Sequence, residues 1–157
     1  MAARGRRESR SLFARAVTLL ARRDYSRAEL AARLRRTLTE ADDPGEVERV
    51  LDALERDKLL SDERYAGTLT RTRSARFGDA RVRYDLKAAG VKADTVDRAV
   101  ASLKGTEVER ARAVWSRRFG ELPTTQEERG RQARFLQARG FSTETIRAVL
   151  RGLPGDD

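Results

Sequence analysis

The sequence repeats itself with a period of 50 residues, and this period limits the possible folds more than any other feature. Four apolar positions and one glycine recur at this offset: Leu86, Gly90, Val91, Val96 and Val100 return as Leu136, Gly140, Phe141, Ile146 and Leu150. Within each copy the apolar residues follow the spacing of amphipathic helices. A period near 50 with helical patterning is typical of tandem helical arrays, in which each unit buries an apolar face against its neighbours.

An earlier copy extends the repeat to the first part of the chain. Phe13, Val17, Leu30 and Leu34 stand 52 positions before Tyr65, Leu69, Val82 and Leu86. We therefore predict an all-α fold of three tandem three-helix repeats that form an elongated, curved helical array. The expected repeats span residues 11–61, 62–104 and 105–152, between a flexible basic leader at residues 1–10 and a tail at residues 153–157. The first copy carries an insertion of about three residues at positions 39–42.

Apolar spacing alone does not prove a repeat, because unrelated three-helix units share it. The coincidence of Gly90 with Gly140 and of Thr95 with Thr145 favours a true repeat. Each glycine stands where a residue in the left-handed conformation would end the middle helix of its unit.

Polar residues mark the expected starts of several helices. Capping patterns of the S/T-x-x-E type stand before three of the expected helices, at Ser26 with Glu29, Thr106 with Glu109, and Thr125 with Glu128. Asp43 before Pro44 predicts an N-cap for the third helix, and Ser142 predicts one for the last.

The net charge of +9 is unevenly distributed. Residues 4–36 hold 11 basic and 3 acidic residues, whereas residues 40–57 hold 8 acidic and 2 basic ones, so the first repeat is polarised. A second basic band follows between Arg64 and Lys92. Its candidate partner- or DNA-binding residues are Arg71, Arg73, Arg76, Arg81, Arg83 and Lys87, with Arg134 and Arg139 as further candidates in the third repeat.

Such a band suits the phosphate backbone of a nucleic acid or an acidic groove on a protein. Arg81 and Arg83 flank the predicted core residue Val82, so their side chains should point away from the core. The alternative is that helices merely display arginines to solvent and that codon bias makes arginine common.

Aromatic rings near arginines could either pack in the core or stack on nucleic-acid bases. Core packing is predicted for Tyr65, Trp115, Phe135 and Phe141, whereas Phe77 and Tyr84 fit either core packing or stacking on bases.

Catalysis has no visible basis in the sequence. The chain has no histidine and no cysteine, which removes the commonest general base, the thiol nucleophile and the usual metal ligands. No phosphate-binding glycine loop occurs. We therefore expect a protein that is not an enzyme and that uses no cofactor or metal. No apolar run approaches the roughly 20 residues needed to span a bilayer, so we expect no membrane contact and a cytoplasmic location.

Four segments together resemble the RecX family of bacterial RecA regulators. They are RAVTLLARRDYSRAELAARL at residues 15–34, LLSDERYA at 59–66, FGDARVRYDLKAAGV at 77–91 and RFLQARGF at 134–141. The resemblance spans nearly the whole chain and agrees with three tandem three-helix units. It implies a non-enzymatic modulator, mainly an inhibitor, that binds in the groove of the RecA filament on single-stranded DNA. Such a modulator limits filament extension or promotes disassembly, and so restrains recombination and the SOS response.

The residues themselves do not name a partner. They leave open a helical-repeat protein that binds DNA directly through its arginine-rich surface, with weak and salt-sensitive affinity, and also a pure interaction scaffold. No helix carries the mixture of side chains expected of a recognition helix that reads bases. We expect the chain to act as a monomer.

Overall fold

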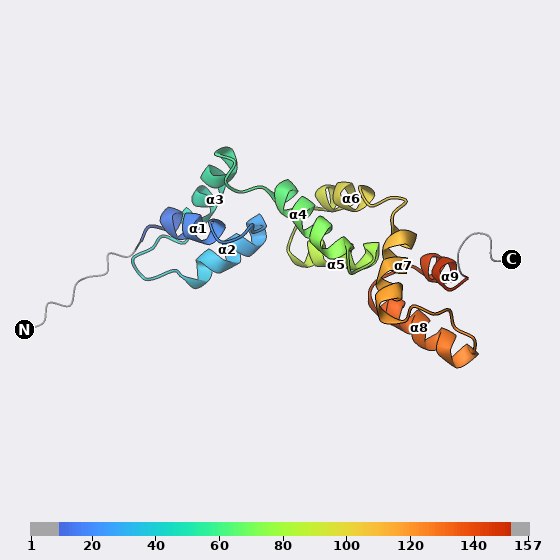
Figure 1. Ribbon diagram of the computed structural model, residues 1–157. Helices are drawn as coiled ribbons and strands as arrows, with labels where there is room; N and C mark the ends of the chain where they lie inside the picture. The colour runs from blue at the N-terminus through green and yellow to red at the C-terminus, as the bar shows by residue number, and fades with distance from the viewer. Residues whose placement is uncertain (1–9, 152–157) are drawn as a thin grey trace, which may run out of the picture. The chain divides into compact units, whose positions relative to one another are not determined.

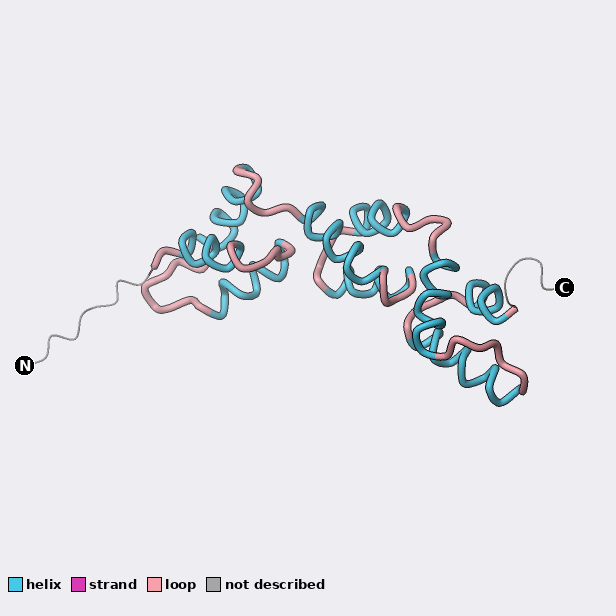
Figure 2. The backbone as a smooth tube through the Cα atoms, in the orientation of Figure 1, coloured by secondary structure: helices cyan, strands magenta, loops and turns pink. Residues whose placement is uncertain are grey.

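The computed structural model describes residues 10–151, and this part of the chain contains nine α-helices and no strand (Figures 1 and 2). The helices are α1 (Leu12–Leu20), α2 (Arg27–Arg36), α3 (Glu46–Arg56), α4 (Asp62–Ser74), α5 (Asp79–Ala88), α6 (Ala93–Ala101), α7 (Glu107–Arg118), α8 (Gln126–Ala138) and α9 (Thr143–Leu150). The prediction of an all-α fold with three tandem three-helix repeats is confirmed. The predicted tail, and the predicted leader apart from Arg10, lie outside the described residues.

Each group of three helices surrounds its own apolar core. Leu30, Leu34 and Leu51 lie at the centre of the first core, Val82 and Leu86 at the centre of the second, and Leu136 and Val149 in the third. The described helices fall into two compact units, with α1 to α3 in the first and α4 to α9, from Glu63 onward, in the second. None of these helices is long and apolar enough to cross a membrane.

The 50-residue offset appears in the backbone as well as in the core. Gly90 and Gly140 adopt φ angles of 78° and 85°, the left-handed region that glycine enters without steric cost. The residue after each glycine donates its amide to the fifth residue before it: Val91 to Leu86 O at 3.2 Å, and Phe141 to Leu136 O at 3.3 Å. Both middle helices therefore end with the same hydrogen-bonding pattern, which satisfies carbonyl groups that the helix leaves unpaired.

The predicted alignment of the first helix is wrong by one residue. Phe13 and Val17 are 39% and 37% exposed, while Leu12 and Ala16 enter the core. One position corresponds to a rotation of about 100° around a helix. The rotation of α1 is fixed at its start, where Ser11 Oγ accepts from Ala14 N, and at its middle, where Arg15 bonds to the end of α2.

Three of the five predicted N-caps are confirmed and two are wrong. Ser26, Thr125 and Ser142 cap α2, α8 and α9, each accepting an amide hydrogen three residues later. Thr106 instead donates its hydroxyl to Leu103 O, so it makes no side-chain cap. Asp43 was predicted to cap the third helix, but α3 begins at Glu46 and Asp43 accepts from the amide of Gly45 within the preceding turn.

Candidate functional site

The connection between α4 and α5 is held by side chains from the third repeat. Arg110 of α7 donates Nη1 to Ser74 O at 3.0 Å and to Phe77 O at 2.8 Å, and its Nη2 bonds to Asp79, the first residue of α5. Its Nε donates to Thr106 Oγ1 at 3.0 Å. Hydrogen bonds from a charged donor are stronger than neutral ones, and these are partly buried. The turn at residues 75–78 is therefore fixed in position.

Two glycines bring the backbones of the second and third repeats together beside this arginine. The amide of Gly78 donates to Arg139 O at 2.8 Å. A Cβ atom at Gly78 would lie 2.2 Å from Gly140 O, and one at Gly140 would lie 2.6 Å from the Cβ of Arg81. Only glycine fits this contact, because real Cβ atoms do not approach other heavy atoms so closely.

Arginines and phenylalanines gather on the surface next to this contact. The half-buried ring of Phe77 has three guanidinium groups near it, with centroid distances of 5.8 Å for Arg73, 4.8 Å for Arg81 and 5.4 Å for Arg139. The guanidinium of Arg139 also lies 5.2 Å from the ring of Phe135. These distances are within the range of cation–π attraction, which holds each guanidinium over a ring.

The same surface continues over α7 and α8. Phe119 and Phe135 meet edge to face with centroids 5.3 Å apart, and Arg118 lies within 6 Å of both rings. Two hollows adjoin here and share Arg118 and Phe135. One, of about 380 Å³, is lined by Arg76, Val114, Arg117, Arg118, Phe135 and Arg139, and the other by Arg118, Phe119, Arg131, Arg134 and Phe135. We call the residues around Phe77 and those lining both hollows the arginine-phenylalanine surface.

No acidic side chain lines either hollow, so the positive charge there is not neutralised locally. Guanidinium groups bind phosphate and carboxylate oxygens through paired hydrogen bonds, and rings provide flat apolar faces beside them. The surface can therefore bind an anionic partner that also offers apolar or planar groups.

The structure brings five of the eight predicted binding residues to this surface: Arg73, Arg76, Arg81, Arg134 and Arg139. Arg71 lines a different hollow, between α4 and α6. Arg83 pairs with Asp97 of α6 at 2.6 Å, and Lys87 is exposed in the last turn of α5. Arg81 and Arg83 lie beside fully buried Val82 and are half-buried themselves, and Arg81 Nε also donates to Asp85 at 3.1 Å.

Sequence reasoning missed Arg117, Arg118 and Arg131. Arg117 and Arg118 stand in the last turn of α7, where basic residues commonly offset the negative end of a helix, so their sequence position alone does not indicate a binding role. The predicted core positions Tyr65, Trp115 and Phe141 are buried, whereas Phe135 is half-buried. Tyr84, which the sequence left open, is 67% exposed.

One carboxyl group near the contact between the repeats has a shifted pKa. Burial raises the pKa of Glu107, although the amide of Ser142 donates to it at 2.8 Å, and neighbouring Asp79 raises it further. No group of three or more acidic side chains that could hold a metal ion occurs within residues 10–151.

Comparison with known proteins identifies the family. The model of the second three-helix domain of RecX matches residues 61–100, and the model of the third matches residues 106–150. The regulatory protein RecX of Leptothrix cholodnii is 47% identical over 141 residues, which cover 90% of this chain and 88% of the relative. The chain belongs to the RecX family.

Other members agree with this assignment. The regulatory protein RecX of Ralstonia nicotianae is 40% identical over 146 residues, covering 93% of this chain and 90% of the relative. The crystal structure of RecX from Lactobacillus salivarius covers 89% of this chain and 92% of its own, with a TM-score of 0.75 at 17% identity. A second crystal structure of a regulatory protein RecX covers 90% of this chain and 72% of its own, with a TM-score of 0.76 at 19% identity. The RecX fold is thus shared by chains of low sequence identity.

Proposed function

We propose that this RecX-family chain is a non-enzymatic modulator, mainly an inhibitor, of the RecA recombinase. It binds in the groove of the RecA filament on single-stranded DNA, where it limits filament extension or promotes disassembly. The effect is to restrain recombination and the SOS response. The observation that supports this proposal is the arginine-phenylalanine surface, because its guanidinium groups are not neutralised by a carboxylate in either hollow and suit an acidic groove or DNA phosphates.

The residues expected to contact the filament are those of this surface that the fold does not require. Arg76 and Arg118 are exposed and share one hollow, and neither makes an ion pair with another described residue. Arg110 is different, because it holds the turn between α4 and α5 and its loss would disturb the fold itself.

A second candidate function is direct binding of DNA by the same surface. The rings of Phe119 and Phe135 between arginines favour it, since bases stack on aromatic side chains in grooves that bind single strands. The two functions differ in which complex is the tighter one. A RecA modulator binds the filament more tightly than the same DNA without RecA, and a direct DNA binder does not.

The test compares two double variants that lose the same charge. Arg76→Glu with Arg118→Glu reverses two charges on the surface, and Arg129→Glu with Arg147→Glu reverses two exposed arginines that line neither hollow. We expect the first pair to lower affinity for a RecA filament at least tenfold and to relieve inhibition of strand exchange. The second pair should stay within about threefold of the parent, because charges outside an interface act only through long-range attraction.

Affinity for filament and for bare single-stranded DNA is measured at several salt concentrations. If the parent protein binds the filament and the bare DNA with equal affinity and equal salt slopes, the RecA modulator is ruled out in favour of the direct DNA binder. Equal losses in the two double variants would show that net charge, and not this surface, controls binding.

A further inference from the structure

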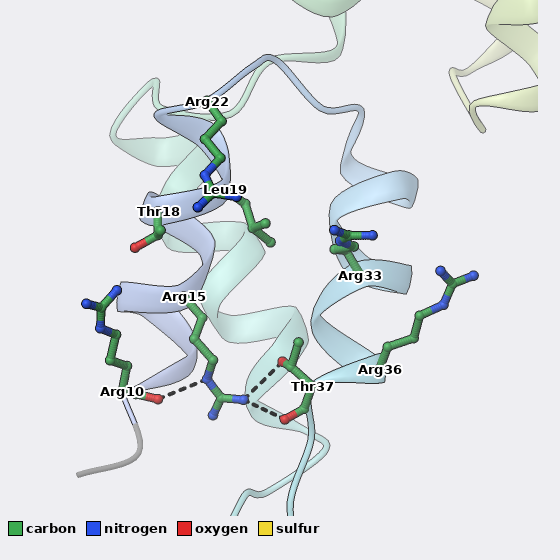
Figure 3. Close-up of a pocket in the computed structure, with 8 residues that line it drawn as sticks. All are labelled: Arg10, Arg15, Thr18, Leu19, Arg22, Arg33, Arg36 and Thr37. Carbon is green, nitrogen blue, oxygen red and sulfur yellow. Dashed lines mark hydrogen bonds between the residues drawn. The ribbon is translucent and has the colours of Figure 1, made fainter. Parts of the chain in front are cut away.

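A separate basic groove lies in the first repeat, between α1 and α2 (Figure 3). Its volume is about 380 Å³, and its lining residues are Arg10, Arg15, Thr18, Leu19, Arg22, Arg33, Arg36 and Thr37. Five of these eight are arginines, and the lining contains neither an acidic side chain nor an aromatic ring. The groove is part of the first compact unit and shares no residue with the arginine-phenylalanine surface.

Arg15 holds the two walls of this groove together. Its Nη1 donates to the carbonyl and hydroxyl oxygens of Thr37, the two bonds drawn between these residues in Figure 3, at distances of 2.7 and 3.0 Å. Its Nη2 pairs with Asp42 at 2.9 Å. Hydrogen bonds from the amide of Thr39 and from Arg15 lower the pKa of Asp42. The insertion at residues 39–42 thus supplies the carboxylate that neutralises Arg15, and Arg15 is a structural residue.

The other four arginines of the groove have no such partner. The side chains of Arg10, Arg22, Arg33 and Arg36 are exposed, and no guanidinium group among them makes a hydrogen bond or an ion pair with a residue in the described part of the chain. Arg10 bonds to Arg15 only through its main-chain oxygen, which accepts from Arg15 Nε at 2.9 Å (Figure 3). The groove therefore carries four positive charges that the fold neither neutralises nor uses.

The arginines of α2 that face the opposite way are neutralised by α3. Arg27 contacts Glu48 and Asp52 at 2.8 Å and Glu55 at 3.0 Å. Although burial lowers the pKa of Arg27, these carboxylates outweigh burial and raise it. Arg35 likewise pairs with Glu48. Display of arginine to solvent does not explain this arrangement, because α3 supplies acids to one side of α2 and none to the groove.

We propose that this groove is a second anion-binding site that takes the phosphodiester backbone of nucleic acid. Guanidinium groups bind phosphates in the geometry of paired hydrogen bonds, and Arg33 and Arg36 stand three residues apart in α2 on one wall, about 4.5 Å along the helix axis. An acidic peptide fits less well, since peptide recognition uses pockets for side chains and Leu19 is the single apolar residue of the lining. Without a ring the groove contacts phosphates and does not stack on bases, so binding is independent of sequence.

The test again uses two double variants of the full chain with equal loss of charge. Arg33→Gln with Arg36→Gln removes two charges of the groove, and Arg35→Gln with Arg56→Gln removes two exposed arginines of the same repeat that lie outside it. Binding of a fluorescent oligothymidylate and of a duplex of mixed sequence is followed by anisotropy across salt concentrations. We expect the groove variant to bind about tenfold more weakly at low salt and the control to stay within about twofold.

The salt slope gives a second readout. Loss of two phosphate contacts should reduce the slope by about 1.4 for a single strand and about 1.8 for a duplex. A reduction with one form of DNA only would identify that form as the ligand. Unchanged salt slopes in the groove variant would overturn the proposal. A competition experiment gives a further check, in which polyglutamate or polythymidylate is added to displace the bound oligonucleotide. If polyglutamate displaces it at the same concentration of charges as polythymidylate, the groove does not prefer phosphates and the proposal is overturned.

This site is independent of the proposed filament contact, and the two can fail separately. The groove variant leaves Arg76 and Arg118 in place, so loss of DNA binding with intact binding of the RecA filament supports the groove alone. Loss of filament binding in the Arg76 and Arg118 variant, with intact affinity for bare DNA, supports the filament contact alone.

Discussion

Alanine at Gly78 should separate the second and third repeats where their backbones touch. A Cβ atom there would lie 2.2 Å from Gly140 O, 2.4 Å from Gly140 C and 2.5 Å from Phe141 N. All three atoms belong to the backbone, so no side chain can rotate to make room. The φ and ψ angles of Gly78, −74° and 170°, are open to alanine, and the effect is therefore steric.

The expected loss of stability is the sum of a steric cost and a weakened hydrogen bond, reduced by the lower entropy of the unfolded alanine variant. Crowding of this kind costs about 1 to 3 kcal/mol, and the hydrogen bond from Gly78 N to Arg139 O contributes about 1 kcal/mol. Alanine restricts the unfolded chain and returns roughly 0.4 to 1 kcal/mol. The free energy of unfolding should fall by about 2 kcal/mol, which for a chain of this length lowers Tm by roughly 4 to 8 °C.

Gly67→Ala is the matched control. Gly67 lies within α4, and a Cβ atom there would meet only the Nη1 atom of Arg71, at 3.5 Å. Because glycine weakens a helix interior relative to alanine by about 0.5 to 1 kcal/mol, this variant should be more stable than the parent. Urea denaturation followed by circular dichroism compares the three proteins. A Gly78→Ala variant as stable as Gly67→Ala would refute the close backbone contact.

Two further predictions concern the third repeat. Because the pKa of Glu107 is raised in the folded state, the protein loses stability as the pH rises through that pKa. Glu107→Gln, which also removes repulsion from Asp79, should therefore raise Tm at pH 7 and lose this advantage near pH 4. A difference in Tm that does not depend on pH would contradict the raised pKa of Glu107. Trp115 Nε1 donates to Gln132 Oε1 at 2.8 Å in the core, so Trp115→Phe should cost about 2 kcal/mol in urea denaturation by leaving this oxygen without a donor. Gln132→Leu also removes the bond from Gln132 Nε2 to Glu121 O at 3.2 Å, so the double variant is compared with both single variants. It should lose less stability than the two single losses added together, and fully additive losses would show that the Trp115–Gln132 hydrogen bond is not the main term.

The repeat was predictable from the sequence because it depends on local rules. Apolar spacing placed Leu86 and Leu136 in their cores, and the identical offset of Gly90 and Gly140 indicated the left-handed ends of two middle helices. The same rules did not determine the rotation of α1. Leu12, Phe13, Ala16 and Val17 form a continuous apolar stripe in which two faces are equally plausible, and contacts made by Arg15 decide between them.

The candidate surface was only partly predictable, because the sequence does not show which charges pair. Arg83 and Arg139 look alike in the sequence, yet Asp97 neutralises Arg83 while Arg139 lies between two rings. Arg110 was not a candidate at all, although it fixes the turn on which the surface is built. Such differences arise from contacts between separate helices and turns, 14 positions apart for Arg83 with Asp97 and 36 for Arg110 with Ser74, and the helical periodicity of the sequence does not contain them.

The fixed turn between α4 and α5 affects how the arginine-phenylalanine surface would bind. Arg139 is restrained by the rings of Phe77 and Phe135 and by a bond to Arg76 O, so much of its rotational freedom is lost when the chain folds. A mobile arginine loses that freedom only when it binds its partner, at a cost of about 0.5 to 1.5 kcal/mol per side chain. The third repeat thus presents a guanidinium whose orientation is set before any partner arrives, and association should show a correspondingly small entropic penalty at this position.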